Sequence, residues 1–293
     1  MRTNFNELVV SLGKPGPQLK RIETRDIPGP HGAIPVRIYW PDDAGDGALP
    51  MFADFHGSGF VVLGLESYDN VCRELAEGAG CIVVAVDYRK APENKFPKPT
   101  DDAWAATEWA VANRAELGGD AARLVGGGDS AGGNLAAVTA QRAARQGAPK
   151  IALQLLVYPV TDMSDDSDSY RRFADGYNLT ADMMRWFMRS YLNGDDERTD
   201  PTAAPLRARD VSAVAPALIL TASHDPLLDD GIRYGEKLRA AGVPATQIDC
   251  PGQIHGFWYF SAPSMLPMKP APKPARHCAR PSPALNPVWF RQH

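Results

Sequence analysis

The sequence predicts an α/β fold, a three-layer sandwich around a mostly parallel sheet of eight strands, and two observations point to it. Short apolar runs alternate with helical patterns, an order typical of strand–helix–strand units with right-handed crossovers. One junction of this kind carries Gly128-Asp129-Ser130-Ala131-Gly132-Gly133, which places a serine between an apolar run and an alanine-rich helical segment. The hydrophobic content of 44% and the charged content of 23% are ordinary for a globular protein with a full core.

Eight apolar runs are the predicted strands. The first two are joined by a Pro/Gly/His turn and predict an antiparallel pair. The other six are short and mostly apolar, as expected for strands that are covered on both faces. In chain order the runs are Arg21–Ile27, Ile34–Trp40, Met51–His56, Ile82–Tyr88, Leu124–Gly126, Ile151–Tyr158, Ala217–Ala222 and Thr246–Cys250.

Helical patterns lie between these strands, and one long insertion interrupts the alternation. The patterns are Tyr68–Ala79, Thr100–Leu117, Asn134–Gln146 and Gly231–Ala241. The insertion, residues 162–214, is polar and aromatic, and Thr180 suits the N-cap of a helix that reaches Asn193. Long insertions at the carboxyl edge of a sheet build lids and pockets. We therefore expect a cap made of residues 1–19 and 162–214, and a substrate pocket lined by Phe60, Met183, Trp186 and Phe187.

The chain changes character near Ser261. Prolines stand at positions 263, 267, 270, 272, 274, 281, 283 and 287, a density that prevents any sustained helix. We expect one folded domain over residues 1–261 and a poorly ordered, proline-rich tail over residues 262–293. The abrupt change suggests a shift of reading frame, which a helix-coding alternative frame in the parent DNA would support.

Ser130 is the predicted nucleophile. The glycines at the two flanking positions of Gly-x-Ser-x-Gly, Gly128 and Gly132, leave room for a tight turn from strand to helix. Such a turn presents the hydroxyl at the N-terminus of a helix, where backbone N–H groups and the helix dipole favour developing negative charge.

Asp225 and His255 are the predicted partners of this serine. A serine hydroxyl needs a base and a group that orients the base, and in this architecture the chain order is serine, acid, histidine. His255 follows the last predicted strand, whereas His277 and His293 lie in the tail. Asp225 comes shortly after the run Ala217–Ala222.

Three other aspartates are weaker candidates for the acid. Asp229 and Asp230 suit the N-terminus of the following helix, where carboxylates are favourable. Asp249 lies within a predicted strand, so it competes less well with Asp225.

The loop His56-Gly57-Ser58-Gly59-Phe60 is the predicted source of donors for an oxyanion. Acyl transfer passes through a tetrahedral intermediate whose negative oxygen needs hydrogen-bond donors. The loop follows the strand Met51–His56, and its small residues allow N–H groups to turn toward Ser130. The predicted donors are the backbone N–H groups of Ser58, Gly59 and Ala131.

Together these segments resemble the hormone-sensitive-lipase-like esterases, the bacterial family IV carboxylesterases of the α/β-hydrolase fold. The resemblance covers about residues 20–260, and the matching segments occur in the order and approximate spacing of that family. These segments are His56–Phe60, Asp87–Glu93, Gly128–Gly133, Tyr158–Pro159, Asp225–Gly231 and His255–Phe257. The resemblance implies hydrolysis of short- to medium-chain carboxylic esters by a triad of Ser130, Asp225 and His255. It also implies that no metal and no cofactor is needed.

The chain departs from the family pattern at two places. The family's oxyanion loop usually reads His-Gly-Gly-Gly, and here Ser58 stands at the third position. If this position needed a conformation open only to glycine, the serine would cost about 1–2 kcal/mol. The second departure is the proline-rich tail, which replaces the amphipathic helix that normally follows the His-Gly-Phe segment.

Two other functions remain open at this point. An amidase or arylformamidase would use the same residues on a C–N bond. A non-catalytic ligand receptor of the same fold, similar to the plant gibberellin receptors, would lack the catalytic histidine, so His255 argues against it.

Composition excludes several partner classes. A net charge of −4 and the absence of Lys/Arg runs argue against nucleic-acid binding. No stretch approaches about 18 apolar residues and no secretory signal precedes residue 14, so we expect a cytoplasmic protein without a membrane span. The four cysteines lack metal-like spacing and are interpreted as buried or incidental thiols in a reducing cytosol. The expected partner is a small ester, and a homodimer is compatible with the fold.

Overall fold

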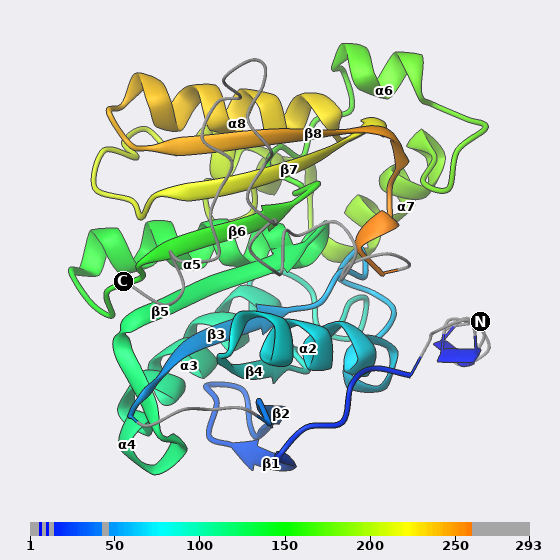
Figure 1. Cartoon of the computed structure of the whole chain (residues 1–293). Coiled ribbons are helices and arrows are strands. Elements are labelled where there is room, and N and C mark those ends of the chain that lie inside the picture. The colour runs from blue at the N-terminus through cyan, green and yellow to red at the C-terminus, as the bar shows by residue number, and fades with distance from the viewer. Residues whose placement is uncertain (1–5, 8–9, 12–14, 43–46, 260–293) are drawn as a thin grey trace, which may run out of the picture.

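The computed structural model describes residues 6–7, 10–11, 15–42 and 47–259 (Figure 1). The predicted tail, 262–293, lies outside the described residues, as do several positions of the segment 1–19. Among the helices that the structure describes, none combines the length and apolarity that crossing a bilayer requires.

One sheet of eight strands organises the chain, in the order β1-β2-β4-β3-β5-β6-β7-β8. β2 pairs antiparallel with β1 and with β4, and the remaining neighbours pair parallel, which confirms the predicted fold class. The strands are β1 (Arg21–Ile27), β2 (Ile34–Trp40), β3 (Leu49–Phe55), β4 (Ile82–Val86), β5 (Gly119–Asp129), β6 (Leu153–Val157), β7 (Ala217–His224) and β8 (Ala245–Ile254).

Helices connect the parallel strands and cover both faces of the sheet (Figure 1). Their bounds are α2 (Leu65–Ala79), α3 (Lys98–Ala112), α4 (Arg114–Leu117), α5 (Ala131–Gln146), α6 (Asp168–Arg172), α7 (Ala181–Tyr191) and α8 (Leu228–Ala240), with short 3-10 turns η1 (Asp195–Thr199) and η2 (Pro205–Arg207). The insertion between β6 and β7 therefore holds α6, α7, η1 and η2.

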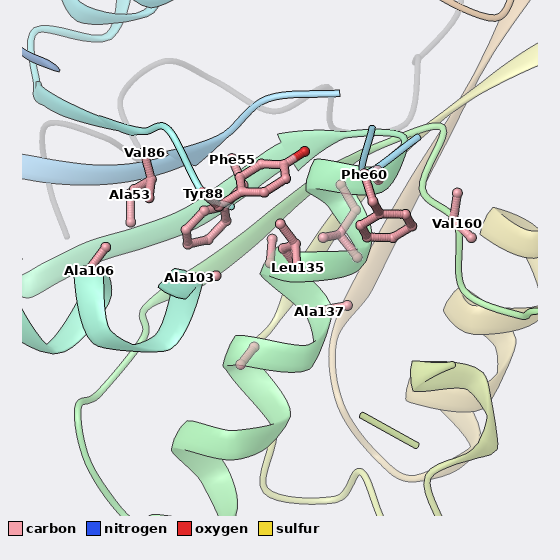
Figure 2. Close-up of a cluster of buried hydrophobic side chains, with 14 of the residues drawn as sticks. Ala53, Phe55, Phe60, Val86, Tyr88, Ala103, Ala106, Leu135, Ala137 and Val160 are labelled. Atoms are coloured by element: carbon pink, nitrogen blue, oxygen red, sulfur yellow. The ribbon is translucent and has the colours of Figure 1, made fainter. Parts of the chain in front are cut away.

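Two buried clusters, one on each face of the sheet, form the core. On one face, α2 packs Val71 and Leu75 against strand residues such as Phe52. On the other face, α3, α5 and α8 pack against the sheet, with Leu135 of α5 at the centre. Figure 2 shows part of this second cluster, in which Phe55, Phe60 and Tyr88 lie near Leu135 of α5. Alternation of side chains along each buried strand is what supplies both clusters from one sheet.

Two element boundaries differ from the prediction for identifiable reasons. The expected helix Thr100–Leu117 is divided at Asn113, whose side-chain amide and backbone N–H both donate to the carbonyl of Trp109. A local bond of this kind competes with continuation of the helix. The strand expected over Leu124–Gly126 is longer at both ends, because β5 begins at Gly119 and continues through Gly127 and Gly128 to Asp129.

The cysteines within the described residues behave as predicted. Cys72, Cys81 and Cys250 are buried free thiols, and Cys278 lies outside the described residues. Burial raises the pKa of Cys81 to about 12, so this thiol stays protonated and unreactive at neutral pH.

Candidate active site

The turn from β5 into α5 holds Ser130 in a strained backbone conformation. Its φ of 53° lies in the left-handed region, which side-chain-bearing residues seldom adopt. A Cβ added at Gly128 would lie 2.1 Å from the carbonyl oxygen of Phe55, and one added at Gly132 would lie 1.6 Å from the same atom. The two glycines are therefore required by the close approach of β3, as the motif predicts.

Ser130, His255 and Asp225 form one chain of hydrogen bonds. The Oγ of Ser130 lies 3.0 Å from Nε2 of His255, and Nδ1 of His255 lies 2.7 Å from Oδ2 of Asp225. Since a carboxylate only accepts, Nδ1 of His255 carries the proton and Nε2 is left to accept the serine proton. All three side chains are buried, and Asp225 has no exposed surface.

The carboxyl ends of three parallel strands bring these residues together. Ser130 follows β5, Asp225 follows β7 and His255 follows β8. The remaining carboxylate oxygen of Asp225 accepts the backbone N–H of Leu227 at 2.9 Å, which holds the side chain in the turn before α8. The ring of Tyr158 lies 4.5 Å from the ring of His255 and packs against it.

The competing aspartates occupy other places. Asp230 is buried in the first turn of α8 and accepts the backbone N–H groups of Thr161 and Asp162. Asp229 accepts the backbone N–H of Ser169. Asp249 is exposed on β8, where the hydroxyl of Thr221 lies 3.3 Å from it.

The loop after β3 adopts left-handed conformations, although not at Ser58. Gly59 has a φ of 56° and Phe60 a φ of 64°, while Ser58 is absent from the described residues with positive φ. The expected cost of a serine at this position therefore does not arise from its backbone. Within the described part of the chain, the N–H groups of Ser58 and Gly59 have no hydrogen-bond partner. They remain available as donors beside the serine turn.

Asp129, which precedes Ser130, joins the serine turn to this loop. Its carboxylate accepts the backbone N–H of Gly57 at 2.7 Å and the hydroxyls of Tyr68 and Tyr158 at 3.0 and 3.2 Å. Burial raises the pKa of Asp129, against the lowering effect of these donors. The sequence analysis gives Asp129 no role, although an acidic residue inside a glycine-rich turn is a signal of its own.

The helix α7 of the insertion contacts the same loop through two aromatic rings. A Cβ added at Gly59 would lie 2.3 Å from the ring of Phe187, so this ring lies directly on the glycine. The rings of Phe60 and Tyr191 are stacked, with centroids 3.8 Å apart. Thr180 caps α7, since its hydroxyl accepts the N–H of Met183, as predicted.

The four predicted pocket residues take different positions. Phe60 is buried in the core cluster, and Phe187 is partly buried against it. Met183 and Trp186 are 39% and 43% exposed on α7. The lining of the substrate pocket by all four stays a prediction.

A second contact from the insertion reaches the histidine loop. The side-chain amide of Asn178 donates to the backbone carbonyl of His255 at 3.0 Å. The sequence carried no signal for this residue, because the two positions are 77 residues apart. Within the described residues, no group of three or more His, Cys, Asp or Glu side chains has the arrangement of a metal site.

Known proteins resemble this chain in sequence and structure. A family model described as the alpha/beta hydrolase fold matches residues 52–259. Esterase LipI of Mycobacterium tuberculosis is 44% identical over 243 residues, or 82% of this chain and 76% of LipI. Ethyl acetate hydrolase of Pseudomonas putida is 43% identical over 230 residues, or 76% of this chain and 71% of that enzyme. The hyperthermophilic esterase of Pyrobaculum calidifontis has a similar structure, with a TM-score of 0.83 at 39% identity, covering 90% of this chain and 87% of its own.

These matches cover the segments that carry the site. The family model runs from within β3 to the residues after His255, so Ser130 and Asp225 also lie inside it. By name, these relatives are two esterases and a hydrolase of ethyl acetate, and their matches extend over most of both chains. The chain therefore belongs to the α/β-hydrolase family, in which it is a hormone-sensitive-lipase-like carboxylic ester hydrolase.

Proposed function

We propose that the protein is a serine carboxylesterase for short- to medium-chain esters, with Ser130, His255 and Asp225 as its catalytic triad. The observation that carries this proposal is the unbroken hydrogen-bond chain from Oγ of Ser130 through His255 to Asp225. Its two distances, 3.0 and 2.7 Å, are within the range in which a base takes a proton and an acid orients the base.

In the first half of the reaction, Oγ of Ser130 attacks the ester carbonyl carbon while Nε2 of His255 takes the serine proton. The carbonyl π electrons move to oxygen and give a tetrahedral oxyanion. His255 then gives its proton to the alcohol oxygen, the C–O bond to the alcohol breaks, and the acyl group remains on Ser130. Asp225 stabilises the imidazolium through Nδ1–H.

In the second half, water replaces the alcohol. His255 takes a proton from water, and the hydroxide oxygen attacks the acyl carbon. The second tetrahedral intermediate collapses when His255 returns the proton to Oγ of Ser130, and the carboxylic acid leaves. In both intermediates the proposed donors to the oxyanion are the backbone N–H groups of Ser58 and Gly59, in the loop after β3, and of Ala131, at the start of α5.

A cap formed by residues 1–19 and 162–214 is part of this proposal. Support comes from both segments, since Oδ1 of Asn6 accepts the N–H of Leu63 at 2.9 Å and the ring of Phe187 lies on Gly59. A bulky ring beside the oxyanion loop favours a short acyl chain. The similar Pseudomonas putida protein, named for hydrolysis of ethyl acetate, agrees with this preference.

Hydrolysis of p-nitrophenyl esters from acetate to palmitate, with one aryl formamide, tests the proposal. We expect turnover to be greatest between about two and eight acyl carbons and weak on the formamide. Rates that climb steadily from hexanoate to palmitate would refute the short pocket. A formamide turned over faster than any ester would favour the amidase, and binding without turnover of any compound would favour a receptor.

The location and assembly of the protein are further predictions. We propose a cytoplasmic protein, for which cell fractionation is the test, since a purely membrane-bound or secreted pool would contradict it. A homodimer is tested by light scattering across a dilution series, and a constant monomer mass would contradict it.

A further inference from the structure

The hydroxyl of Ser58, the chain's departure from the family loop, belongs to a small buried network. Oγ of Ser58 lies 2.5 Å from the phenolic oxygen of Tyr88 and accepts the backbone N–H of Phe60 at 3.1 Å. The phenolic oxygen of Tyr88 lies 2.7 Å from the carbonyl oxygen of His56. All four residues are buried, so water does not compete for these bonds.

Counting protons gives each of these bonds a direction. The carbonyl oxygen of His56 can only accept, so the single phenolic proton of Tyr88 is donated to it. Burial raises the pKa of Tyr88 far above its ordinary value, which keeps that proton in place. The phenolic oxygen of Tyr88 must then accept from Ser58, and Oγ of Ser58 accepts from Phe60. The order is Phe60 N–H to Ser58, Ser58 O–H to Tyr88, and Tyr88 O–H to the carbonyl of His56.

We propose that Ser58 is a positioning residue, which acts through Tyr88 and Phe60 to hold the oxyanion loop in its left-handed shape. The proposal rests on the proposed function, because the loop matters only if it binds an oxyanion. The hydroxyl of Ser58 has one proton, and that proton is used on Tyr88. The side chain therefore acts on the loop, and the backbone N–H of Ser58 acts on the substrate.

The loop requires such support at Phe60. This residue has a φ of 64°, which is unfavourable for a side-chain-bearing residue, and it is almost fully buried. Its N–H has Oγ of Ser58 as its partner in the described part of the chain. With glycine at position 58, this N–H would lose that partner in a buried place, which is itself unfavourable.

At its other end the network fixes the backbone carbonyl of His56, which accepts the hydroxyl of Tyr88. The rings of His56 and Tyr88 are stacked, with centroids 4.4 Å apart, so the phenol has a fixed position beside the loop. The network therefore joins His56, the first residue of the loop, to Phe60, the residue after the two proposed donors. Donors that are held in place before the reaction stabilise the oxyanion most, so a looser loop should raise the barrier more than it weakens substrate binding.

The test compares Ser58→Ala, Tyr88→Phe and the double variant on p-nitrophenyl butyrate. We expect each single variant to lower kcat by about tenfold with KM within about twofold, because the loss falls on the transition state. The double variant should also lose about tenfold, since both changes break one network. Inhibition by an alkyl boronic acid, which forms a tetrahedral adduct, should weaken by a similar factor.

Matched variants separate positioning from general destabilisation. Thr107→Val removes another buried hydroxyl, one that donates to the carbonyl of Ala103 within α3, and should leave kcat and boronic acid inhibition unchanged. Ser58→Thr keeps the hydroxyl and should recover most of the lost kcat. Circular dichroism and thermal unfolding verify folding for each variant. If Ser58→Ala does not fold, Tyr88→Phe alone carries the test.

Three results would overturn the proposal. The first is an unchanged kcat in Ser58→Ala or Tyr88→Phe. The second is a loss of kcat in the double variant of about a hundredfold, the product of the two single losses. The third is a loss of kcat in Thr107→Val equal to that in Ser58→Ala. Ser130→Ala is measured beside them. If Ser130→Ala keeps wild-type turnover, the proposed function itself is wrong. If Ser130→Ala loses turnover while Ser58→Ala keeps the wild-type kcat, only the positioning role of Ser58 is contradicted.

Discussion

Asp129 and Gly57, which are 72 positions apart, are joined by a hydrogen bond of 2.7 Å from the backbone N–H of Gly57 to the carboxylate. One residue beside Ser130 thereby holds the start of the loop that carries the proposed oxyanion donors. The hydroxyls of Tyr68 and Tyr158 donate to the other carboxylate oxygen and fix the orientation of the side chain. The position of the nucleophile and that of the loop are therefore coupled through a single buried side chain.

Replacing Asp129 should impair turnover more than substrate binding. We expect Asp129→Ala to lower kcat by roughly 10- to 100-fold, because the loop loses its tie to the serine turn. Asp129→Asn keeps an oxygen for Gly57 and should lose less than Asp129→Ala. Steady-state kinetics on p-nitrophenyl butyrate measure both. Asp249→Asn, which changes an exposed carboxylate on β8, is the control. A loss of kcat in this variant equal to that of Asp129→Ala would contradict the coupling of the loop to the serine turn through Asp129.

A pH effect on stability follows from Asp54, a buried residue of β3. Burial, and then the charge of Asp129, raise the pKa of Asp54 to about 7 from an ordinary value of 3.8. The native state therefore keeps a proton that the unfolded chain has lost between about pH 4 and pH 7. In that window the free energy of unfolding should fall as the pH rises. Burial also raises the pKa of Asp230 to about 8, which extends the same trend.

Urea unfolding of Asp54→Asn between pH 4.5 and pH 8.5 measures this contribution. The amide cannot ionise, so the variant should show a shallower fall in the free energy of unfolding than the wild type. Thr107→Val, which removes no ionisable group, should keep the wild-type slope. If Asp54→Asn has the wild-type slope as well, Asp54 does not hold the proton.

Asn178 should influence the catalytic step through the histidine loop. Its amide donates to the backbone carbonyl of His255, so Asn178→Ala removes a contact that fixes the base. We expect kcat to fall by about three- to tenfold with little change in KM. Asn193→Ala removes a similar amide that donates to the carbonyl of Phe96. Similar losses in kcat for the two variants would indicate a general effect of the insertion.

Phe187 should limit the length of the acyl chain. Its ring lies on Gly59, so Phe187→Ala opens space beside the oxyanion loop. The ratio of kcat/KM for octanoate to that for acetate should rise several-fold. Trp109→Ala, which removes a partly buried ring on α3 outside the insertion, should change the ratio little. If the ratio is unchanged in Phe187→Ala, the ring of Phe187 does not limit the length of the acyl chain.

Local signals in the sequence were sufficient for most elements that position the site. Gly128 and Gly132 indicated the tight turn correctly because the constraint lies within the turn and its neighbouring strand. Thr180 indicated the start of α7 because an N-cap acts within three residues. Asp225 and His255 were found by their positions after predicted strands, and the structure brings both to Ser130.

Contacts between distant segments were beyond the reach of those signals. Tyr88 lies 30 positions from Ser58, and Asn178 lies 77 positions from His255, so neither partner could be chosen without the fold. Whether Ser58 would carry a backbone cost could not be decided from the sequence either, and the structure shows that the condition for this cost is not met. The left-handed conformations of the loop fall on Gly59, which adopts them without steric cost, and on Phe60, two positions that the sequence did not single out for such conformations.

Ester hydrolysis by Ser130→Ala tests whether Ser130 is the nucleophile. The side chain makes one hydrogen bond to His255 and carries little packing, so the free energy of unfolding should change by less than about 1 kcal/mol. We expect a kcat on p-nitrophenyl butyrate below about a thousandth of the wild-type value. A folded Ser130→Ala protein that keeps more than about a hundredth of wild-type kcat would contradict the assignment of Ser130 as the nucleophile.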